Sequence, residues 1–231
     1  MSRSIFARLS MCVCLVSMLV VTLPLPMWAG SKEKDEQTLN NAANVLQQML
    51  NDQNIPSDVI GKANCVIVLP NVKKAGFIVG GSGGRGPMVC RSSSTGKWSA
   101  PAMYSIGGVS AGLQAGASSS DYVLLVMNEK AENALLNGKA QLGRDATAAA
   151  GPTGVSATSV SGNDLLTYKR AKGLFAGISM SGASLAPDND ANQRLYGRSI
   201  TAQEIVEGNT VQTPSAGLAM VSLLDSRYAK N

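Results

Sequence analysis

Residues 64–91 read NCVIVLPNVKKAGFIVGGSGGRGPMVCR, and they contain two apolar runs, a basic pair and a glycine-dense segment around one arginine. Short β-branched runs separated by Gly, Pro and Asn are typical of strands joined by turns. In this reading Lys73 and Lys74 occupy a corner between two strands, and Arg85 lies in a glycine turn. The stretch therefore predicts an antiparallel meander of three strands, over 64–69, 76–81 and 86–91.

Runs of the same kind follow along the chain and predict further strands. They are AMYSI (102–106), GLQAG (112–116), YVLLVM (122–127), VSATSV (155–160), LLTY (165–168) and GLFAGISMSGASL (173–185). Several are apolar without alternation, which indicates that both faces of the sheet are covered. The 24 glycines of the chain favour bulges and sharp bends over flat strands.

Helical periodicity and helix-start signals place the helices around this sheet. They are expected over 39–51, 57–63, 129–138, 190–196, 201–207 and 214–229. No linker or internal repeat divides the chain, so one domain is expected over 39–231. The fold class predicted is α+β, with a strongly curved, barrel-like antiparallel β-sheet flanked by helices.

The N-terminal segment has two arginines, an apolar stretch over 9–23 and two helix-breaking prolines, a pattern typical of a secretory signal peptide. We expect it to cover 1–29 with cleavage after Ala29; cleavage after Gly30 and a retained anchor are the alternatives. Residues 30–38 would then be a charged leader. The expected localisation is therefore exported, in the periplasm or cell envelope, or secreted.

The charge is unevenly distributed along the chain. The sequence has 20 Lys and Arg against 15 Asp and Glu, and no acidic residue lies between Val59 and Ser120, where six basic residues occur. A second basic cluster contains Lys169, Arg170 and Lys172. Such asymmetry indicates an anionic partner or surface, with solvated hairpin tips as the alternative.

The absence of histidine removes the usual general base and the commonest metal ligand. Two G-x-S-x-G strings, around Ser82 and Ser110, have neither a histidine nor a following helix and so do not predict a hydrolase. The G-x-G-x-x-G string that ends at Gly86 leads into a strand, so it indicates a hairpin turn whose N–H groups and Arg85 could contact an anion. No enzyme, cofactor or metal site is predicted.

The two cysteines of the mature chain, Cys65 and Cys90, lie two strands apart in the predicted meander. That separation is about 9–10 Å, beyond the roughly 7 Å Cα limit for a disulfide. We therefore expect two buried free thiols.

Several segments resemble the SYLF domain family in its own order. Besides 64–91 they are GKWSAPAMYSIGG (96–108), DYVLLVMNEKAENALL (121–136), LGRDATAAAGP (142–152) and YKRAKGLFAGISMSGASLAPDNDANQRLYG (168–197). The resemblance covers most of residues 40–225. It implies a phospholipid-binding module, since members of the family bind phospholipids and eukaryotic members also associate with actin. The basic positions that match the motif are Lys73, Lys74 and Arg85.

The function predicted is therefore non-enzymatic binding of anionic phospholipids or a membrane surface, in the bacterial cell envelope. Three engaged cations supply roughly 3 kcal/mol, less than the ~4 kcal/mol of a millimolar dissociation constant, so an apolar group or a headgroup pocket must add to them. Trp98, in a predicted hairpin, is the exposed aromatic candidate, with a core or edge-strand position as its alternative. Candidate lipid-binding residues are Lys73, Lys74, Arg85, Arg91, Lys97, Trp98, Lys169, Arg170 and Lys172.

A structural or protein-interaction scaffold of the periplasm is the alternative function. Nucleic acid is not an expected partner, because aromatic residues make up only 4% of the chain and form no stacking platform. Protein partners are not identified by the sequence.

Overall fold

The computed structural model describes residues 27–76, 79–111, 116–138, 140–142, 148–150, 164–172, 183–208 and 210–229. The helices are α1 (Met27–Asn51), α2 (Ser57–Ile60), α3 (Glu129–Leu136), α4 (Asn189–Tyr196), α5 (Ala202–Val206), the 3-10 turn η2 (Ser215–Gly217) and α6 (Leu218–Tyr228). The strands are β1 (Cys65–Gly76), β2 (Val79–Cys90), β3 (Ala102–Ala111), β4 (Gly116–Val126), β5 (Ala140–Gln141), β6 (Ala148–Ala150), β7 (Leu165–Lys172) and β8 (Ser184–Pro187).

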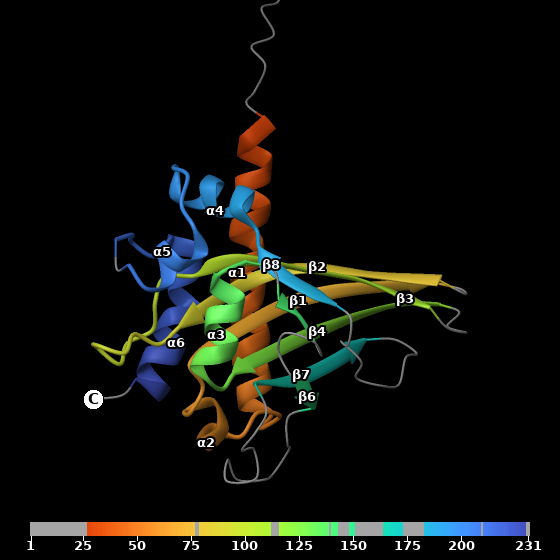
Figure 1. Cartoon of the computed structure of the whole chain (residues 1–231), viewed down its shortest axis with the longest axis horizontal. Helices are drawn as coiled ribbons and strands as arrows, with labels where there is room; N and C mark the ends of the chain where they lie inside the picture. The colour runs from red at the N-terminus through yellow and green to blue at the C-terminus, as the bar shows by residue number, and fades with distance from the viewer. Residues whose placement is uncertain are drawn as a thin grey trace, which may run out of the picture.

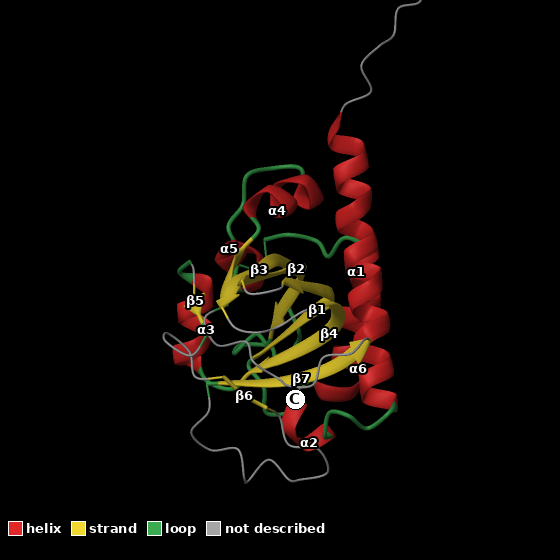
Figure 2. Ribbon diagram, turned by 90° about the vertical axis from the view of Figure 1, so that its right-hand side faces the viewer, coloured by secondary structure: helices red, strands yellow, loops and turns green. Residues whose placement is uncertain are grey.

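The strands form one eight-stranded sheet with the order β5-β8-β3-β2-β1-β4-β7-β6 (Figure 1). All neighbouring pairs are antiparallel except β6 and β7, which are parallel. Helices flank the sheet, and its strands curve and twist (Figure 2). The predicted α+β class is confirmed, but among the described strands the sheet ends at β5 and β6, so it does not close into a barrel.

The segment 64–91 forms one long hairpin instead of the predicted three-strand meander. β1 and β2 each have 12 residues, and their register runs from Cys65 opposite Cys90 to Gly76 opposite Gly80. Pro70 and Asn71, expected at a corner, lie inside β1, where the register shifts between Ile67 and Lys73. These turn-forming residues make a bulge within the strand, so the prediction of a corner was wrong.

The bulge is held by a side chain of the neighbouring strand. Asn71 has a φ of 55°, and its backbone N–H donates to Oδ1 of Asp121 in β4 at 2.9 Å. The carboxylate thus replaces a ladder partner that the bulged backbone has lost. A two-residue irregularity is accommodated in this way without ending the strand.

The two faces of the sheet bury two separate hydrophobic clusters. On one face, Val66, Val68 and Val89 pack with apolar residues of α1, α2 and α6. On the other face, Ile67 and Met88 pack with residues of α3 and α5. Successive residues alternate between the clusters because strand side chains alternate in direction. The prediction that both faces are covered is confirmed.

Cys65 and Cys90 are directly opposite each other in the hairpin and form a disulfide, with their Cα atoms 4.0 Å apart. The expectation of two free thiols was wrong. It assumed a strand between the two cysteines, and the fusion of the predicted segments into two long strands removes that strand.

The first helix is longer than predicted, because α1 starts at Met27 and includes residues 30–38, which were expected to be a leader. Among the described residues, none of the helices has the length and hydropathy needed to span a bilayer. Residues 1–26 of the predicted signal peptide, the strand 155–160 and most of 173–185 lie outside the described residues. The remaining predicted helices correspond to α2–α6 with small changes at their ends.

Replacing Gly86 by alanine should strongly destabilise the fold. A Cβ atom at this position would lie 1.8 Å from the carbonyl oxygen of Val68 in the central strand β1, so backbone must move. We expect the free energy of unfolding to fall by about 3 kcal/mol, measured by urea denaturation followed by circular dichroism. Gly81→Ala in the same strand is the control, since nothing lies within 4 Å of its Cβ position. Equal denaturation midpoints for the two variants would contradict the close approach.

Reducing the disulfide should lower the free energy of unfolding by about 3 kcal/mol, since the cross-link closes a loop with a sequence separation of 25. The measurement is urea denaturation of the folded chain with and without a reductant, with free thiols counted in each sample. The double variant C65S/C90S is the control and should not respond to the reductant. A parent protein that is equally stable with both thiols free would show that the cross-link does not stabilise the fold.

Candidate functional site

A polar groove runs between α1 and the face of the sheet that it covers. It consists of two adjoining cavities of about 290 and 420 Å³ that share Asn41, Pro70 and Asn71. We call it the helix–sheet groove. The first cavity also contains Thr38, Lys73, Gly83, Gly84 and Arg85, and the second also contains Asn44, Val45, Gln48, Ser119, Ser120, Asp121 and Arg170.

The groove exists because α1 turns a polar stripe towards the sheet beside its apolar one. Thr38, Asn41, Asn44 and Gln48 follow one another at helical spacing and line the cavities. The adjacent positions Ala42, Leu46 and Met49 are buried in the core. The Asn and Gln side chains of this helix therefore supply amide donors and acceptors to the groove.

Lys73 is the exposed cation of the groove. It lies opposite Gly83 of β2 and Ser119 of β4, so small neighbours flank it on both strands. Among the described residues, no carboxylate lies within ion-pair distance of its ammonium group. Lys73 thus presents an uncompensated positive charge beside neutral hydrogen-bonding side chains.

The two arginines of the groove, in contrast, have carboxylate partners. Nη2 and Nε of Arg170 donate to Oδ2 of Asp121 at 2.8 and 3.1 Å. Arg85 lies in β2 opposite Ser105 and contacts Asp35 at 3.1 Å and Asp188 at 3.2 Å. The prediction that Arg85 sits in a glycine turn was wrong, because the glycines around it belong to a paired strand.

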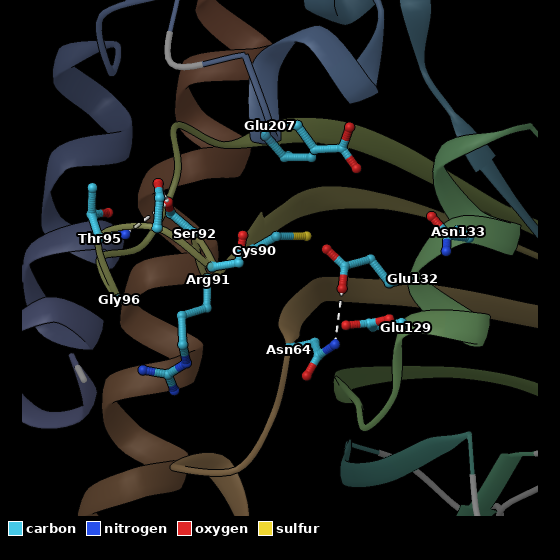
Figure 3. Close-up of a pocket in the computed structure, with 13 residues that line it drawn as sticks. Asn64, Cys90, Arg91, Ser92, Thr95, Gly96, Glu129, Glu132, Asn133 and Glu207 are labelled. Atoms are coloured by element: carbon cyan, nitrogen blue, oxygen red, sulfur yellow. Dashed lines mark hydrogen bonds between the residues drawn. The ribbon is translucent and has the colours of Figure 1, made fainter. Parts of the chain in front are cut away.

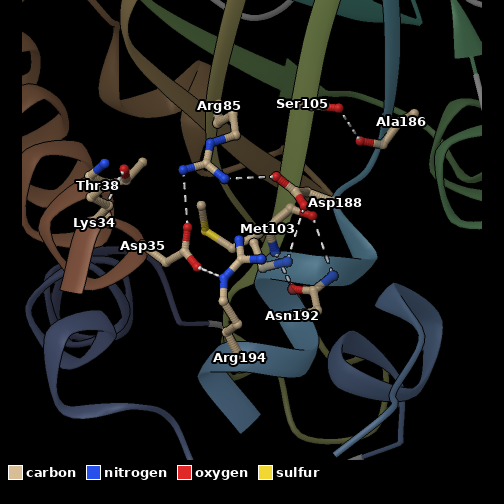
Figure 4. Close-up of polar contacts among 11 residues, drawn as sticks. Lys34, Asp35, Thr38, Arg85, Met103, Ser105, Ala186, Asp188, Asn192 and Arg194 are labelled. Carbon is tan, nitrogen blue, oxygen red and sulfur yellow. Dashed lines mark hydrogen bonds and ion pairs between the residues drawn. The ribbon is translucent and has the colours of Figure 1, made fainter. Parts of the chain in front are cut away.

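Figure 4 shows the ion-pair network that Arg85 joins. Asp35 of α1 is fully buried, and Nε of Arg194 in α4 donates to its Oδ2 at 2.7 Å. Asp188 accepts from the backbone N–H of Ala191 and caps α4. The network therefore fixes α1, β2 and α4 to one another, and much of the charge of Arg85 is used in this structural role.

The predicted pair Lys73 and Lys74 is divided between the faces of the sheet. Val72 belongs to the cluster under α3 and α5, so by alternation Lys74 points to that face and Lys73 to the face of α1. Burial, and secondly the charge of Lys169, lower the pKa of Lys74. Lys172 is the last residue of β7, and its side chain lies outside the described part of the chain.

Arg91, Lys97 and Trp98 lie at the other end of the hairpin, away from the groove. Arg91 donates to the backbone oxygens of Tyr228 and Gly61, and its guanidinium stacks 4.4 Å from the Trp98 ring centroid. Trp98 is only 5% exposed, so its alternative as a core residue is correct and the expectation of an exposed aromatic was wrong. Lys97 is exposed. The nine predicted residues therefore do not form one surface.

The serine and glycine motifs lie within strands. Ser82 and Ser110 belong to β2 and β3, and Oγ of Ser82 makes a 3.5 Å contact with the carbonyl oxygen of Gly108. The glycines up to Gly86 pair with β3 from Val109 to Tyr104. The predicted hairpin turn with free N–H groups was therefore wrong, because this segment is paired as part of the sheet.

A second cavity, of about 780 Å³, lies where α3 faces the end of β2 (Figure 3). Glu129 and Glu132 of α3 and Glu207 beyond α5 line it, together with Cys90 and Arg91. Burial raises the pKa of Glu132, and the neighbouring Glu207 and Glu129 raise it further, against a hydrogen bond from Asn64. Sequence reasoning missed this cavity, since its residues come from separate elements and form no spaced motif.

Comparison with known proteins identifies the chain's relatives. The family described as "Ysc84: Las17-binding protein actin regulator" matches residues 107–227. SH3 domain-containing YSC84-like protein 1 of Homo sapiens is 36% identical over 183 residues, 76% of this chain and 52% of that protein. Protein YSC84 of Saccharomyces cerevisiae is 33% identical over 76% of this chain and 38% of its own length. SH3 domain-containing protein PJ696.02 of Schizosaccharomyces pombe is 32% identical over 88% of this chain and 49% of its own length.

No solved structure matches the chain. The chain spans about half or less of the length of these curated relatives. The identity nevertheless extends over three quarters or more of the chain itself. The chain therefore belongs to the Ysc84 family, the SYLF domain family that its sequence motifs indicated.

Proposed function

We propose that this chain is a non-enzymatic module that binds the headgroups of anionic phospholipids in the helix–sheet groove. The observation that carries the proposal is the exposed, uncompensated Lys73 in a cavity lined by Thr38, Asn41 and Asn71. A phosphate oxygen accepts hydrogen bonds from an ammonium group and from side-chain amide donors such as those of Asn41 and Asn71. Arg85 and Arg170 add positive potential to the groove while they remain paired with their aspartates.

Hydrogen bonds from the groove can supply the binding free energy that charge alone does not provide. One lysine near an anionic surface contributes about 1 kcal/mol, and each hydrogen bond to a charged group contributes about 1.5–3 kcal/mol. Together with the contribution of Lys73, two or three such bonds from the groove's side chains would reach or exceed the ~4 kcal/mol of a millimolar dissociation constant. A headgroup pocket is thus a better description than a diffuse basic surface.

An apolar contact with the membrane is available beside Lys73. Val109 in β3 is 84% exposed. Lys73 of β1 pairs with Gly83 of β2, which pairs in turn with Gly107 of β3, and Val109 lies two residues beyond Gly107. Residues two apart on a strand share a face, so Val109 and Lys73 project from the same side of the sheet. The C-terminal end of β3, where Val109 lies, extends past the helices (Figure 1). We infer that this side meets the bilayer.

The place where this binding would occur is the cell envelope. The signal-like N-terminal segment supports export, and the anionic lipids would then be those of the leaflets that face the periplasm. An oxidising compartment also favours the disulfide between Cys65 and Cys90.

A protein-binding scaffold is the second candidate, and the family description favours it. That description names Las17 binding and actin regulation, and one relative of Saccharomyces cerevisiae is named LAS seventeen-binding protein 3. For an exported chain the partner would be an envelope protein instead of an actin regulator. The surface cations would then contact protein, and vesicles would not be bound.

Reversing the charge of Lys73 should weaken lipid binding. We expect Lys73→Glu to reduce the affinity for phosphatidylglycerol or cardiolipin vesicles, measured by cosedimentation, about 30-fold at low salt, because the reversal removes one attraction and adds one repulsion of about 1 kcal/mol each. Lys62→Glu is the matched control, since Lys62 is also exposed and lies outside the groove. The groove assignment fails if the two variants, both folded by circular dichroism, bind alike. The scaffold function is favoured if the parent chain ignores anionic vesicles.

Replacing the exposed valine tests the apolar contact. Val109→Asp should reduce vesicle binding several-fold, and the loss should persist at high salt, where screening has already weakened the charged contacts. Leu218→Asp is the control, because Leu218 is 50% exposed but lies at the start of α6. An unchanged affinity of Val109→Asp at both salt concentrations would show that this side of the sheet does not meet the bilayer.

A further inference from the structure

The cavity of about 780 Å³ beside α3 contains an unusual set of chemical groups (Figure 3). The Sγ atoms of Cys65 and Cys90 and a carboxylate oxygen of Glu132 all lie within 4.8 Å of one another. The two sulfurs come from β1 and β2 and the carboxylate from α3. Cys90 is 2% exposed and lines the cavity, so the pair of sulfurs lies at the cavity wall.

We propose that reduction of the Cys65–Cys90 disulfide creates a Zn²⁺ site, in which both thiolates and the Glu132 carboxylate are the protein ligands. Thiolate sulfur and carboxylate oxygen are normal zinc ligands, and three protein ligands leave a fourth, tetrahedral position for water. The open side of the cavity supplies that water. The oxidised and metal-bound states exclude each other, since sulfurs joined in a disulfide do not ligate as thiolates.

The surroundings of Glu132 suit this role. Asn64 Nδ2 donates to Oε2 of Glu132 at 3.0 Å, which orients the carboxylate and leaves Oε1 for a metal. Asn64 directly precedes Cys65, so the orienting group and one ligand move together. The carboxylate is half-buried among Glu129 and Glu207, and this environment favours a bound cation over an uncompensated negative charge.

Reduction of the disulfide needs only a phosphine and water as reactants. A phosphine reductant transfers two electrons to the disulfide and becomes a phosphine oxide with oxygen from water, and the two protons of that water go to the thiols. Zinc then binds both sulfurs and displaces two protons to the buffer. Binding should therefore release protons and weaken as the pH falls.

The test is a titration of the whole chain, reduced with a phosphine and kept free of oxygen, with Co²⁺ as the spectroscopic probe. We expect one Co²⁺ per chain with a thiolate-to-cobalt charge-transfer band, which Zn²⁺ abolishes by displacement. The oxidised chain should show no such band. Glu132→Gln should weaken Co²⁺ binding by at least about tenfold. Glu129→Gln, on the same helix and cavity wall, should weaken it much less, because Glu129 acts on the site through its charge and not as a ligand.

Several outcomes would overturn the site. They are a reduced chain that shows no charge-transfer band, equal Co²⁺ affinities of the two glutamine variants, and a disulfide that the phosphine cannot reduce in the folded chain. Unfolding on reduction that Zn²⁺ does not reverse, followed by circular dichroism, would also contradict the proposal. C65S/C90S must abolish the band, because it removes both sulfurs.

Discussion

The bulge at Asn71 is the constraint on which both faces of this molecule depend. Before it, Cys65, Ile67 and Leu69 face the cluster under α3 and α5; after it, Val72 faces that same cluster, so odd and even positions have exchanged sides. A regular strand would send Lys73 into the apolar core and Val72 into the polar groove. The hydrogen bond from the N–H of Asn71 to Asp121 stabilises the bulge and so keeps Lys73 on the side of the groove. The position of the groove's free cation is therefore a consequence of one backbone irregularity.

Asp121 connects that irregularity to the charge pattern of the groove. One of its oxygens holds the bulge, and the other accepts from Arg170. At the other end of the groove Asp35, fully buried, contacts Arg85 and Arg194. Removing one member of such a buried network leaves its partners uncompensated, which is more costly than the net stabilisation that the network provides. These arginines thus shape the groove's potential, whereas Lys73 is available to a ligand.

The sequence could predict the elements of the fold better than their connections. Local patterns located the helices from α2 to α6 and strand segments such as 102–106 and 122–127, because alternation and helical periodicity are local properties. The same rules failed over 70–86, since Pro70, Asn71 and the glycines have two possible uses. They can end a strand, or they can permit a bulge and a close backbone approach such as that of Gly86 to Val68. That choice depends on neighbours distant in sequence, and it also decided the pairing of Cys65 with Cys90.

The charges of the candidate site also depend on residues that are distant in sequence, so the sequence alone did not predict them correctly. A region without acidic residues in sequence suggested one basic surface, yet Asp35 and Asp188 neutralise Arg85 from before and after that region. Charge along the chain therefore overstates the charge presented to a partner, and only spatial pairing separates structural cations from available ones. By this criterion Lys73 is the cation of the groove that is available to a ligand, and its neighbours there are polar. The features that we assign to a ligand and to a metal then lie towards opposite ends of β1, at Lys73 and Cys65, so each can be altered without touching the other.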